Sequence, residues 1–362
     1  MNITCVIHSL DGGGAERVMA GLASRLRSRG HGVTLITLDD GREDRHTVDP
    51  AVRRVLLDVA ATSRSTFSAI ANNLSRINAL RAAIRQSKPD VVLSFCDSTN
   101  VLVMIATRGL GIRTIVSERS DPKMQTMREP WSMMRRRLYR RADQVVVLTR
   151  DAAKTVAPWC QNDPIVIPSA VDVPPPSDGT PRNVQSKTIL GVGRLEHEKG
   201  FDRLVDAFAT LASDHPQWNL RIVGEGSLRE KLQQQIVAHG IQERVTMPGW
   251  VRPIWPEYRH ADMFILPSRY EGFPSALLEA MAVGVAVIAV DCESGPREII
   301  RHDQNGWLVP EDPEALAAAM RKLMIDDTNR QRLGASARDV TDRFGWDAMV
   351  DAYERVLSEY TF

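Results

Sequence analysis

Short apolar segments recur along the chain, and a glycine-rich or polar turn and then an amphipathic stretch follow most of them. Apolar runs of four to eight residues between turn residues are typical of strands, whereas apolar residues at three- and four-residue steps are typical of helices. The first such unit predicts a strand over Ile3–Ser9 and a helix over Ala15–Ser28. The apolar face of that helix carries Val18, Leu22 and Leu26. Repetition of this unit predicts an α/β protein with parallel sheets and right-handed crossovers.

Further strands are expected at the other short apolar segments: Val33–Leu38, Val91–Phe95, Arg113–Ser117, Gln144–Leu148, Ile165–Pro168, Thr188–Val192, Leu220–Val223, Val245–Gly249, Asp262–Pro267, Val285–Val290 and Gly306–Val309. We expect polar turns at Cys96–Asn100 and Glu118–Pro122, directly after two of these strands. Ligands of open α/β sheets bind beyond the carboxyl ends of the strands, so both turns are expected to face a ligand.

A chain of 362 residues is longer than one hydrophobic core usually supports. Proline and glycine crowd together, without apolar periodicity, in a stretch that begins at Val173. This composition is typical of a linker. We therefore expect a first domain over residues 1–172, a linker over 173–183, a second domain over 184–345 and a final helical segment over 346–362.

The composition is that of an ordinary globular protein, with 43% apolar and 25% charged residues. The chain contains no run of about 20 apolar residues, and it begins directly with a strand-like segment. We therefore expect a cytoplasmic protein. The net charge is +1, but residues 1–180 carry 25 Lys and Arg against 18 Asp and Glu. The basic first half can face phosphates or an anionic membrane surface.

Two basic segments stand out in that half. The segment over residues 59–89 contains no acidic residue and has amphipathic helical spacing, with Leu74 and Ile84 on its apolar face. The segment over residues 123–150 holds eight bases interleaved with apolar residues such as Met134. Solvated helix faces, an anionic membrane surface and the pyrophosphate of an acceptor all remain open as interpretations. Nucleic acid is the weakest interpretation, because no recognised nucleic-acid module accompanies these bases.

The stretch Ser268–Ala282 follows an apolar strand and holds two glutamates eight residues apart, Glu271 and Glu279. Between them, Gly272 permits unusual backbone angles, Pro274 suits the first turn of a helix, and Ser275 can cap free amides. A helix N-terminus of this kind attracts anions, and carboxylates accept hydrogen bonds from hydroxyl groups. The stretch therefore predicts a site for a diphosphate with sugar hydroxyls on both sides.

This stretch, with its Gly-Phe-Pro-Ser turn, resembles the E-x7-E signature of the retaining glycosyltransferases of family 4. The sequence Gly193-Arg194-Leu195-Glu196-His197-Glu198-Lys199-Gly200 resembles the G-R-x-x-x-x-K-G motif of the same family. The resemblance implies the GT-B fold: two Rossmann-like domains with parallel sheets that face a central cleft, and a final helix that crosses back to the first domain. The same resemblance implies that the first domain binds the acceptor and the second binds the nucleotide-sugar. It also implies that Arg194 and Lys199 bind the donor diphosphate, Glu271 the donor sugar and Glu279 the ribose, next to the backbone of Gly272, Phe273, Pro274 and Ser275.

Other positions match the family more loosely. The strand–Gly12-Gly13-Gly14–helix segment resembles the first glycine-rich loop, which places Gly13 and Gly14 under the diphosphate and Arg17 within reach of it. Gly224, Trp250 and Val251 fall where the family builds its nucleotide pocket. Where many relatives carry a histidine, this chain has Glu118-Arg119, a sequence similar to that of enzymes that extend lipid-linked oligosaccharides; we expect Glu118 to contact substrate.

Together these features predict a retaining, metal-independent glycosyltransferase. It would move a hexose or N-acetylhexosamine from a nucleotide-sugar, with uridine as the expected base, to a glycan acceptor linked to a polyprenyl diphosphate. No cofactor is expected, because the nucleotide-sugar is a co-substrate, and no metal site is expected, because the chain has no D-x-D motif. We expect peripheral attachment at the inner face of the cell membrane through the basic helices, and no nucleic-acid partner. No residue is assigned as general base. A nucleotide-sugar epimerase, which shares the GT-B layout, remains the alternative, and a non-catalytic sugar-binding protein is a further one.

Overall fold

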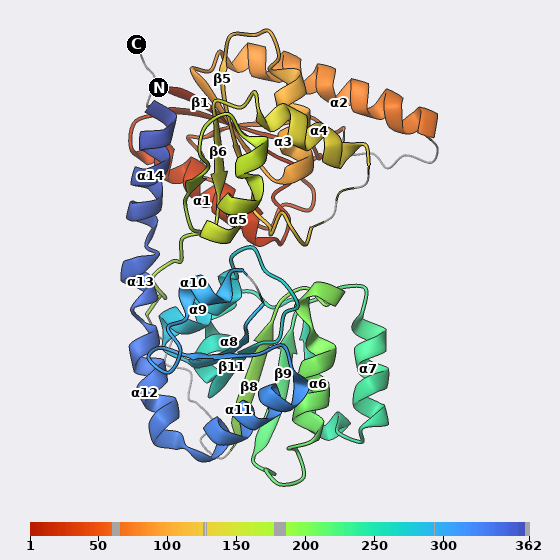
Figure 1. The fold of residues 1–362 in the computed structure, drawn as a ribbon, viewed down its shortest axis with the longest axis vertical. Helices are drawn as coiled ribbons and strands as arrows, with labels where there is room; N and C mark the ends of the chain where they lie inside the picture. Colours follow the sequence, from red (N-terminus) through yellow and green to blue (C-terminus); the bar gives the residue numbers. More distant parts are fainter. Residues whose placement is uncertain (60–65, 126, 128, 177–185, 293, 359–362) are drawn as a thin grey trace. The chain divides into compact units, whose positions relative to one another are not determined.

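The computed structural model describes residues 1–362 except 60–65, 126, 128, 177–185, 293 and 359–362. The chain divides into two compact units (Figure 1). The first unit comprises Met1–Ser169 together with Asp347–Phe362, and the second comprises Ala170–Trp346. The chain therefore passes from one unit to the other twice. Most of the expected linker, residues 177–183, lies outside the described residues.

A seven-stranded sheet with the order β3-β2-β1-β4-β5-β6-β7 forms the centre of the first unit, and every pairing in it is parallel. Its strands are β1 (Asn2–Ile7), β2 (Gly32–Thr37), β3 (Arg53–Leu56), β4 (Val91–Phe95), β5 (Arg113–Ser117), β6 (Gln144–Val147) and β7 (Ile165–Val166). Its helices are α1 (Gly14–Ser28), α2 (Thr66–Ser87), α3 (Asp97–Ala106), α4 (Trp131–Tyr139), α5 (Arg150–Val156), the 3-10 turn η1 (Ala157–Trp159) and α14 (Trp346–Ser358). The order reverses direction between β1 and β4, which makes this edge the topological switch point of the sheet.

A six-stranded parallel sheet with the order β10-β9-β8-β11-β12-β13 forms the centre of the second unit. Its strands are β8 (Lys187–Val192), β9 (Trp218–Val223), β10 (Val245–Gly249), β11 (Met263–Leu266), β12 (Ala286–Val290) and β13 (Trp307–Val309). Its helices are α6 (Phe201–Ala209), α7 (Arg229–Ala238), α8 (Trp255–His260), α9 (Ser275–Val283), α10 (Pro296–Ile299), α11 (Pro313–Ile325), α12 (Asp327–Ala337) and α13 (Val340–Arg343), with the 3-10 turns η2 (His197–Lys199) and η3 (Gln242–Arg244). The switch point here lies between β8 and β11.

Each unit has its own apolar core. In the first unit the predicted face of α1 is confirmed, because Val18, Leu22 and Leu26 are fully buried. Ile84 of α2 is also buried, whereas Leu74 is 56% exposed and does not belong to the core. In the second unit one cluster runs from Ile189 on β8 to Leu333 on α12. Two Rossmann-like domains are thus confirmed as the fold class.

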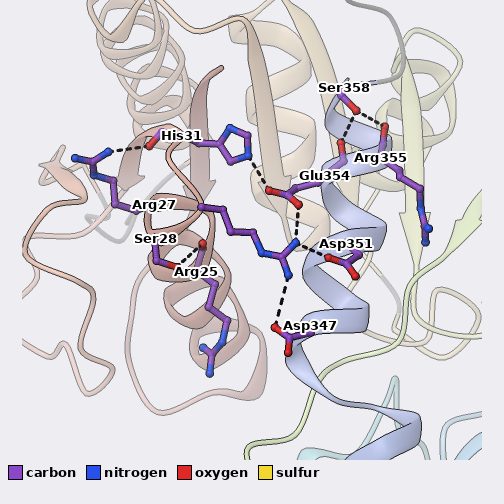
Figure 2. A network of polar contacts seen from close by, with 10 residues as sticks. Arg25, Arg27, Ser28, His31, Asp347, Asp351, Glu354, Arg355 and Ser358 are labelled. Atoms are coloured by element: carbon purple, nitrogen blue, oxygen red, sulfur yellow. Dashed lines mark hydrogen bonds and ion pairs between the residues drawn. The ribbon is translucent and has the colours of Figure 1, made fainter.

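Helix α14 packs on the first unit, although it is the last helix of the chain (Figure 1). Its Tyr353 is fully buried, with its ring 6.0 Å from that of Phe95 and its hydroxyl 3.2 Å from Ser117 Oγ. Acidic side chains of α14 face the end of α1, as Figure 2 shows. Arg29 forms ion pairs with Asp351 and with Glu354, the latter at 2.6 Å, and His31 Nε2 lies 2.8 Å from Glu354 Oε1.

Two local predictions are wrong. The polar turn expected at Cys96–Asn100 is the start of helix α3, because Asp97 and the small polar residues after it favour a helix N-terminus. Ser275 does not cap α9: the N-cap residue is Pro274, in an extended conformation, and no side chain caps it. Ser275 is instead the first helical residue, beyond the position from which a hydroxyl caps the next amides.

Candidate functional site

The loops after β8 and β11 meet at the switch point of the second sheet, and they bring together two residues that lie 72 positions apart. Lys199 ends the 3-10 turn η2, and its Nζ lies 2.8 and 2.9 Å from the two carboxylate oxygens of Glu271. Ser268 Oγ donates a further hydrogen bond of 2.7 Å to Glu271 Oε1. Glu271 is only 7% exposed, so this ion pair is much less screened by solvent than a surface pair.

A second set of contacts fixes the loop that carries Glu271. Arg269 forms a two-pronged ion pair with Asp202, at 2.8 and 2.6 Å, and its backbone amide donates to the carbonyl of Glu198. The hydrogen bond from Arg269 lowers the pKa of Asp202, in spite of partial burial. Gly200 has φ +66°, and a Cβ there would lie 2.1 Å from the carbonyl oxygen of Pro267. Only glycine permits this approach of the two loops.

The start of α9 lies directly after Glu271 and is packed on three sides. Gly295 has φ +87°, and a Cβ there would lie 3.1 Å from Pro274 Cδ. Ser294 Oγ donates to the carbonyl of Glu271 at 2.7 Å. Phe273 is buried and meets the ring of Phe344 edge-on at 5.3 Å. This packing holds the amides of Phe273 and Ser275 at a helix N-terminus, a place that favours an anion.

The other predicted donor residues of the second unit have different surroundings. Glu279 lies inside α9, is 9% exposed and accepts a hydrogen bond of 2.8 Å from the buried Tyr258 hydroxyl. Arg194 is 66% exposed at its side chain and pairs with Glu198 at 2.8 Å. Exposed pairs of this kind are worth little, so Arg194 can leave Glu198 for a ligand. Lys199 lies next to Glu198, and the same loop therefore carries both predicted diphosphate ligands.

Gly224 follows β9 and is explained by close packing of strand ends. Its φ is +145°, and a Cβ there would lie 1.9 Å from the carbonyl oxygen of Gly193. Its amide donates to the carbonyl of Gly249 at 2.9 Å. Trp250 follows β10 with 43% exposure, and Val251 is half-buried. An exposed indole after a strand end is suited to stacking on a nucleotide base.

In the first unit, the glycine-rich loop has a carboxylate folded over it. Gly13 is the N-cap residue of α1, and a Cβ there would lie 2.0 Å from Glu16 Oε2. Glu16 Oε1 lies 3.0 Å from His8 Nε2. Burial alone would lower the pKa of His8, but Glu16 outweighs it and raises that pKa; in the same way His8 lowers the pKa of Glu16 against burial. Gly13 thus makes room for Glu16, while Gly14 and Arg17 occupy the first turn of α1.

Glu118 is fully buried, and its observed neighbours belong to its own unit. The Tyr139 hydroxyl donates to its Oε1, and Arg135 Nη1 lies 3.7 Å from the same oxygen. Burial raises the pKa of Glu118 to about 7, against the opposing effects of Arg135 and Tyr139. Glu118 Oε2 has no hydrogen-bond partner among the described residues, and the expected contact with substrate stays a prediction.

Sequence reasoning missed several polar residues around the two switch points. They are His8, Ser268, Arg269, Ser294 and Tyr258. The positions of His8 and Ser268, one and two residues after a strand, were a usable signal, because side chains there face the ligand edge of a parallel sheet. The roles of Arg269 and Tyr258 depend on partners far away in the sequence, and no local pattern marks them.

No helix among the described residues combines the length and the apolar character needed to cross a membrane. Within the same residues, no group of three or more His, Cys, Asp or Glu side chains could hold a metal ion. The four cysteines are free thiols; Cys5 and Cys292 are buried, and Cys96 and Cys160 are half-buried.

Two family models divide the chain between them. The model described as "Glycosyl transferase 4-like domain" matches residues 13–168, and the model described as "Glycosyl transferases group 1" matches residues 177–340. The fold and both models agree that this chain is a GT-B glycosyltransferase, and it belongs to the group 1, family 4-like glycosyltransferases.

Individual relatives show how far the similarity extends. An exopolysaccharide phosphotransferase of Streptomyces coelicolor is 38% identical over 196 residues, 53% of this chain, but the match spans only 20% of the relative's own length. A Campylobacter jejuni enzyme, GalNAc-α-(1→4)-GalNAc-α-(1→3)-diNAcBac-PP-undecaprenol α-1,4-N-acetyl-D-galactosaminyltransferase, is 27% identical over 99% of both chains. The solved structure of Anabaena HepE in complex with UDP-glucose covers 99% of both chains at 18% identity, with a TM-score of 0.83.

Proposed function

We propose that this glycosyltransferase moves a hexose or N-acetylhexosamine from a uridine diphosphate sugar to a polyprenyl-diphosphate-linked glycan, with retention of configuration. The observation that carries the proposal is the ion pair between Lys199 and the buried Glu271, beside the start of α9 at the switch point of the second sheet. The names of two similar proteins support the choice of substrates: one acts on an undecaprenyl-linked glycan, and the other was solved with UDP-glucose.

The pair offers complementary groups for a sugar diphosphate. When the donor binds, Lys199 and Arg194 exchange their carboxylate partners for the diphosphate, whose other oxygens lie at the amides of Phe273 and Ser275. Glu271, released from Lys199, accepts hydrogen bonds from hydroxyls of the donor sugar, and Glu279 accepts them from the ribose. Trp250 and Val251 contact the base.

Transfer breaks the bond between the anomeric carbon and the diphosphate oxygen, and its electrons leave with UDP. The acceptor hydroxyl oxygen forms the new bond on the same face of the sugar, and its proton passes to the departing phosphate oxygen. Lys199 and Arg194 stabilise the negative charge that grows on the diphosphate, so neither a metal ion nor a cofactor is required.

The assay that tests the function incubates the purified protein with UDP-hexoses and UDP-N-acetylhexosamines, with and without a short-chain prenyl-diphosphate-linked N-acetylgalactosamine. We expect UDP release that depends on the acceptor and persists in EDTA, and an α-linked product from an α-linked donor by NMR. An epimerised donor in the absence of acceptor would instead establish an epimerase, and a product of inverted configuration would exclude retention.

We also propose that basic helices of the first unit attach the enzyme to an anionic membrane. Arg108, Arg137, Arg140 and Arg141 surround a hollow of about 560 Å³, whose apolar wall includes Met134 and Leu138. No ion pair joins any of these four arginines to a described residue. The basic face of α2 contributes less than expected, because Arg76 and Arg81 bond backbone carbonyls of their own unit.

Sedimentation with lipid vesicles tests this attachment. The wild type is expected to bind phosphatidylglycerol vesicles and not phosphatidylcholine vesicles, and Arg137→Glu with Arg140→Glu is expected to abolish binding. Arg355→Glu is the control, because it makes the same change of charge per residue at an exposed position on α14. Equal binding by the double variant and the control would disprove this role of the hollow.

A further inference from the structure

Tyr258 on helix α8 is a buried residue of the second unit that has no assigned role. Its side chain is fully buried, with its ring 6.0 Å from that of Phe264 on β11 and 6.3 Å from that of Trp255. A hydroxyl in such apolar surroundings needs a hydrogen-bond partner, because an unpaired buried hydroxyl is costly. The partner is Glu279 on α9, whose Oε2 lies 2.8 Å from the Tyr258 hydroxyl. The packing thus fixes the ring, and the ring directs its hydroxyl toward a carboxylate of the candidate site.

Helix α8 connects the segments that are proposed to hold the nucleoside. Trp250 and Val251, the proposed contacts of the base, precede α8 in the chain, and β11 and α9 follow it. An ion pair also fixes α8 to the sheet, because Glu257 accepts two hydrogen bonds from Arg221 on β9, at 2.5 and 2.8 Å. Tyr258 is therefore held by an anchored helix as well as by its ring contacts.

The hydrogen bond from Tyr258 restricts the carboxylate that is proposed to bind the ribose. The terminal torsion of a glutamate side chain has broad minima, so hydrogen-bond partners largely set the position of its two oxygens. Glu279 is 9% exposed, and rotation away from the Tyr258 hydroxyl would break a hydrogen bond between buried groups. A carboxylate in a fixed orientation recognises a hydroxyl sharply, because an analogue without that hydroxyl leaves the buried acceptor without its donor. Ribose supplies two such donors, and a dideoxyribose supplies neither.

We propose that Tyr258 is a positioning residue: its hydroxyl holds the Glu279 carboxylate in the orientation that accepts hydrogen bonds from the ribose, and it thereby sets the preference for ribonucleotide over deoxyribonucleotide donors. The inference rests on the proposed transferase function and on the place of Glu279 in it. Tyr258 acts through Glu279 and not by contact with the donor, because its side chain is fully buried. Its loss therefore weakens recognition of the ribose and leaves the binding of the diphosphate by Lys199 and Arg194 unchanged.

Calorimetric titration with UDP and with 2′,3′-dideoxy-UDP separates this role from a structural one. For Tyr258→Phe we expect the affinity for UDP to fall about tenfold, the worth of one hydrogen bond to a charged group, and the affinity for dideoxy-UDP to stay as in the wild type. General damage to the site would instead weaken both ligands equally. Tyr353→Phe, which removes a buried hydroxyl 3.2 Å from Ser117 Oγ in the first unit, is the matched control and should keep the wild-type ratio of affinities.

A double-mutant cycle tests whether Tyr258 acts through Glu279. In a Glu279→Ala background, Tyr258→Phe should change the affinity for UDP by less than about twofold, because no carboxylate is left to position. The inference would be overturned by an unchanged ratio of the two affinities in Tyr258→Phe, or by a full tenfold loss in the Glu279→Ala background. Equal binding of UDP and dideoxy-UDP by the wild type would overturn it as well. Acceptor-dependent UDP release by the wild type would leave the transferase function standing in each of these cases, so the two failures are distinguishable.

Discussion

At the scale of single residues, Lys199 and Glu271 neutralise each other at the ligand edge of the second sheet. The two opposite charges offset the cost of removing the buried Glu271 carboxylate and the half-buried Lys199 ammonium from water. Ser268 Oγ adds a hydrogen bond to the Glu271 carboxylate. The proposed function requires this pair to separate when the donor diphosphate binds.

Lys199→Ala is expected to lower kcat roughly 100-fold, with a much smaller change in donor KM, because the lysine charge is needed most when the diphosphate departs. Initial rates at varied UDP-sugar concentration measure both parameters. Lys154→Ala removes a lysine from an exposed pair with Asp151 in the first unit and should leave both unchanged. If the donor KM rose while kcat stayed unchanged, Lys199 would contribute to donor binding and not to stabilisation of the transition state.

Gly200→Ala is expected to destabilise the second unit by about 3 kcal/mol or more, since the new Cβ combines a left-handed backbone with a collision at Pro267. Gly240→Ala is the matched control: it has nearly the same φ, +67°, but open space around the new Cβ. That change should cost only about 1 kcal/mol. Urea unfolding of both variants measures the difference, and equal costs would show that the two loops can separate.

Glu118 gives the first unit a pH dependence of known sign. Its pKa is raised to about 7 in the folded chain, so between its ordinary value of 4.5 and 7 the folded state binds the proton and the unfolded state does not. Stability from this group is therefore complete below that window and is lost as pH rises through it, by on the order of 3 kcal/mol. Denaturant unfolding at a series of pH values should show a smaller decline for Glu118→Gln than for wild type; parallel curves would contradict the assignment.

At the scale of elements, helix α14 is held on α1 and its following turn by charge as well as by its apolar face (Figure 2). Arg29 connects to three acidic residues on successive turns of α14: Asp347, Asp351 and Glu354. Spacings of three and four residues place these acids on one face of the helix. A network of this kind orients the helix, whereas the burial of its apolar face, which includes Val350 and Tyr353, supplies most of its binding energy.

Arg29→Ala is expected to destabilise the first unit by about 1 kcal/mol at low salt, and by less at high salt, because these pairs are largely exposed. Arg355→Ala is the control on the same helix; Figure 2 shows its side chain directed away from the acidic face. Thermal unfolding at two salt concentrations measures both. A cost for Arg29→Ala that does not change with salt would point to packing rather than charge.

Hydrophobic periodicity predicted most elements, but it failed where charged residues interrupt the apolar pattern of a strand. The strands over Val91–Phe95 and Arg113–Ser117 have the predicted bounds, because each contains a short apolar run that is buried in the parallel sheet. The edge strand β3 was missed, since Arg53 and Arg54 interrupt its apolar character.

The candidate site could be predicted in part, because the residues of each motif are close together in the sequence. The pairing of Lys199 with Glu271 and the position of Glu16 over Gly13 depend on tertiary contacts, which no local pattern shows. A sequence pattern can indicate that a lysine, a glutamate and a flexible loop are present. The pattern does not show which carboxylate forms an ion pair with each lysine or arginine. These pairings determine which charged groups remain available to a ligand.

At the scale of the whole molecule, the two units differ in how the chain builds them. The second unit is one continuous segment, Ala170–Trp346, with an apolar core of its own. The first unit needs both ends of the chain, because residues 347–362 complete what Met1–Ser169 begins. Tyr353 and Val350 of this last segment are fully buried, so their removal leaves uncovered apolar surface.

We therefore expect residues 170–346, produced alone, to unfold cooperatively and to bind UDP by calorimetry, because the fragment keeps the Lys199–Glu271 site and its supporting loops. Residues 1–169 alone should aggregate or unfold at a much lower temperature, since the surface around Phe95 and Ser117 loses Tyr353. Addition of a peptide of residues 347–362 should restore a cooperative transition, and the same peptide with Tyr353→Ala should not. If residues 1–169 melted as the full-length chain does with or without the peptide, α14 would be an attached helix rather than part of the core of that unit.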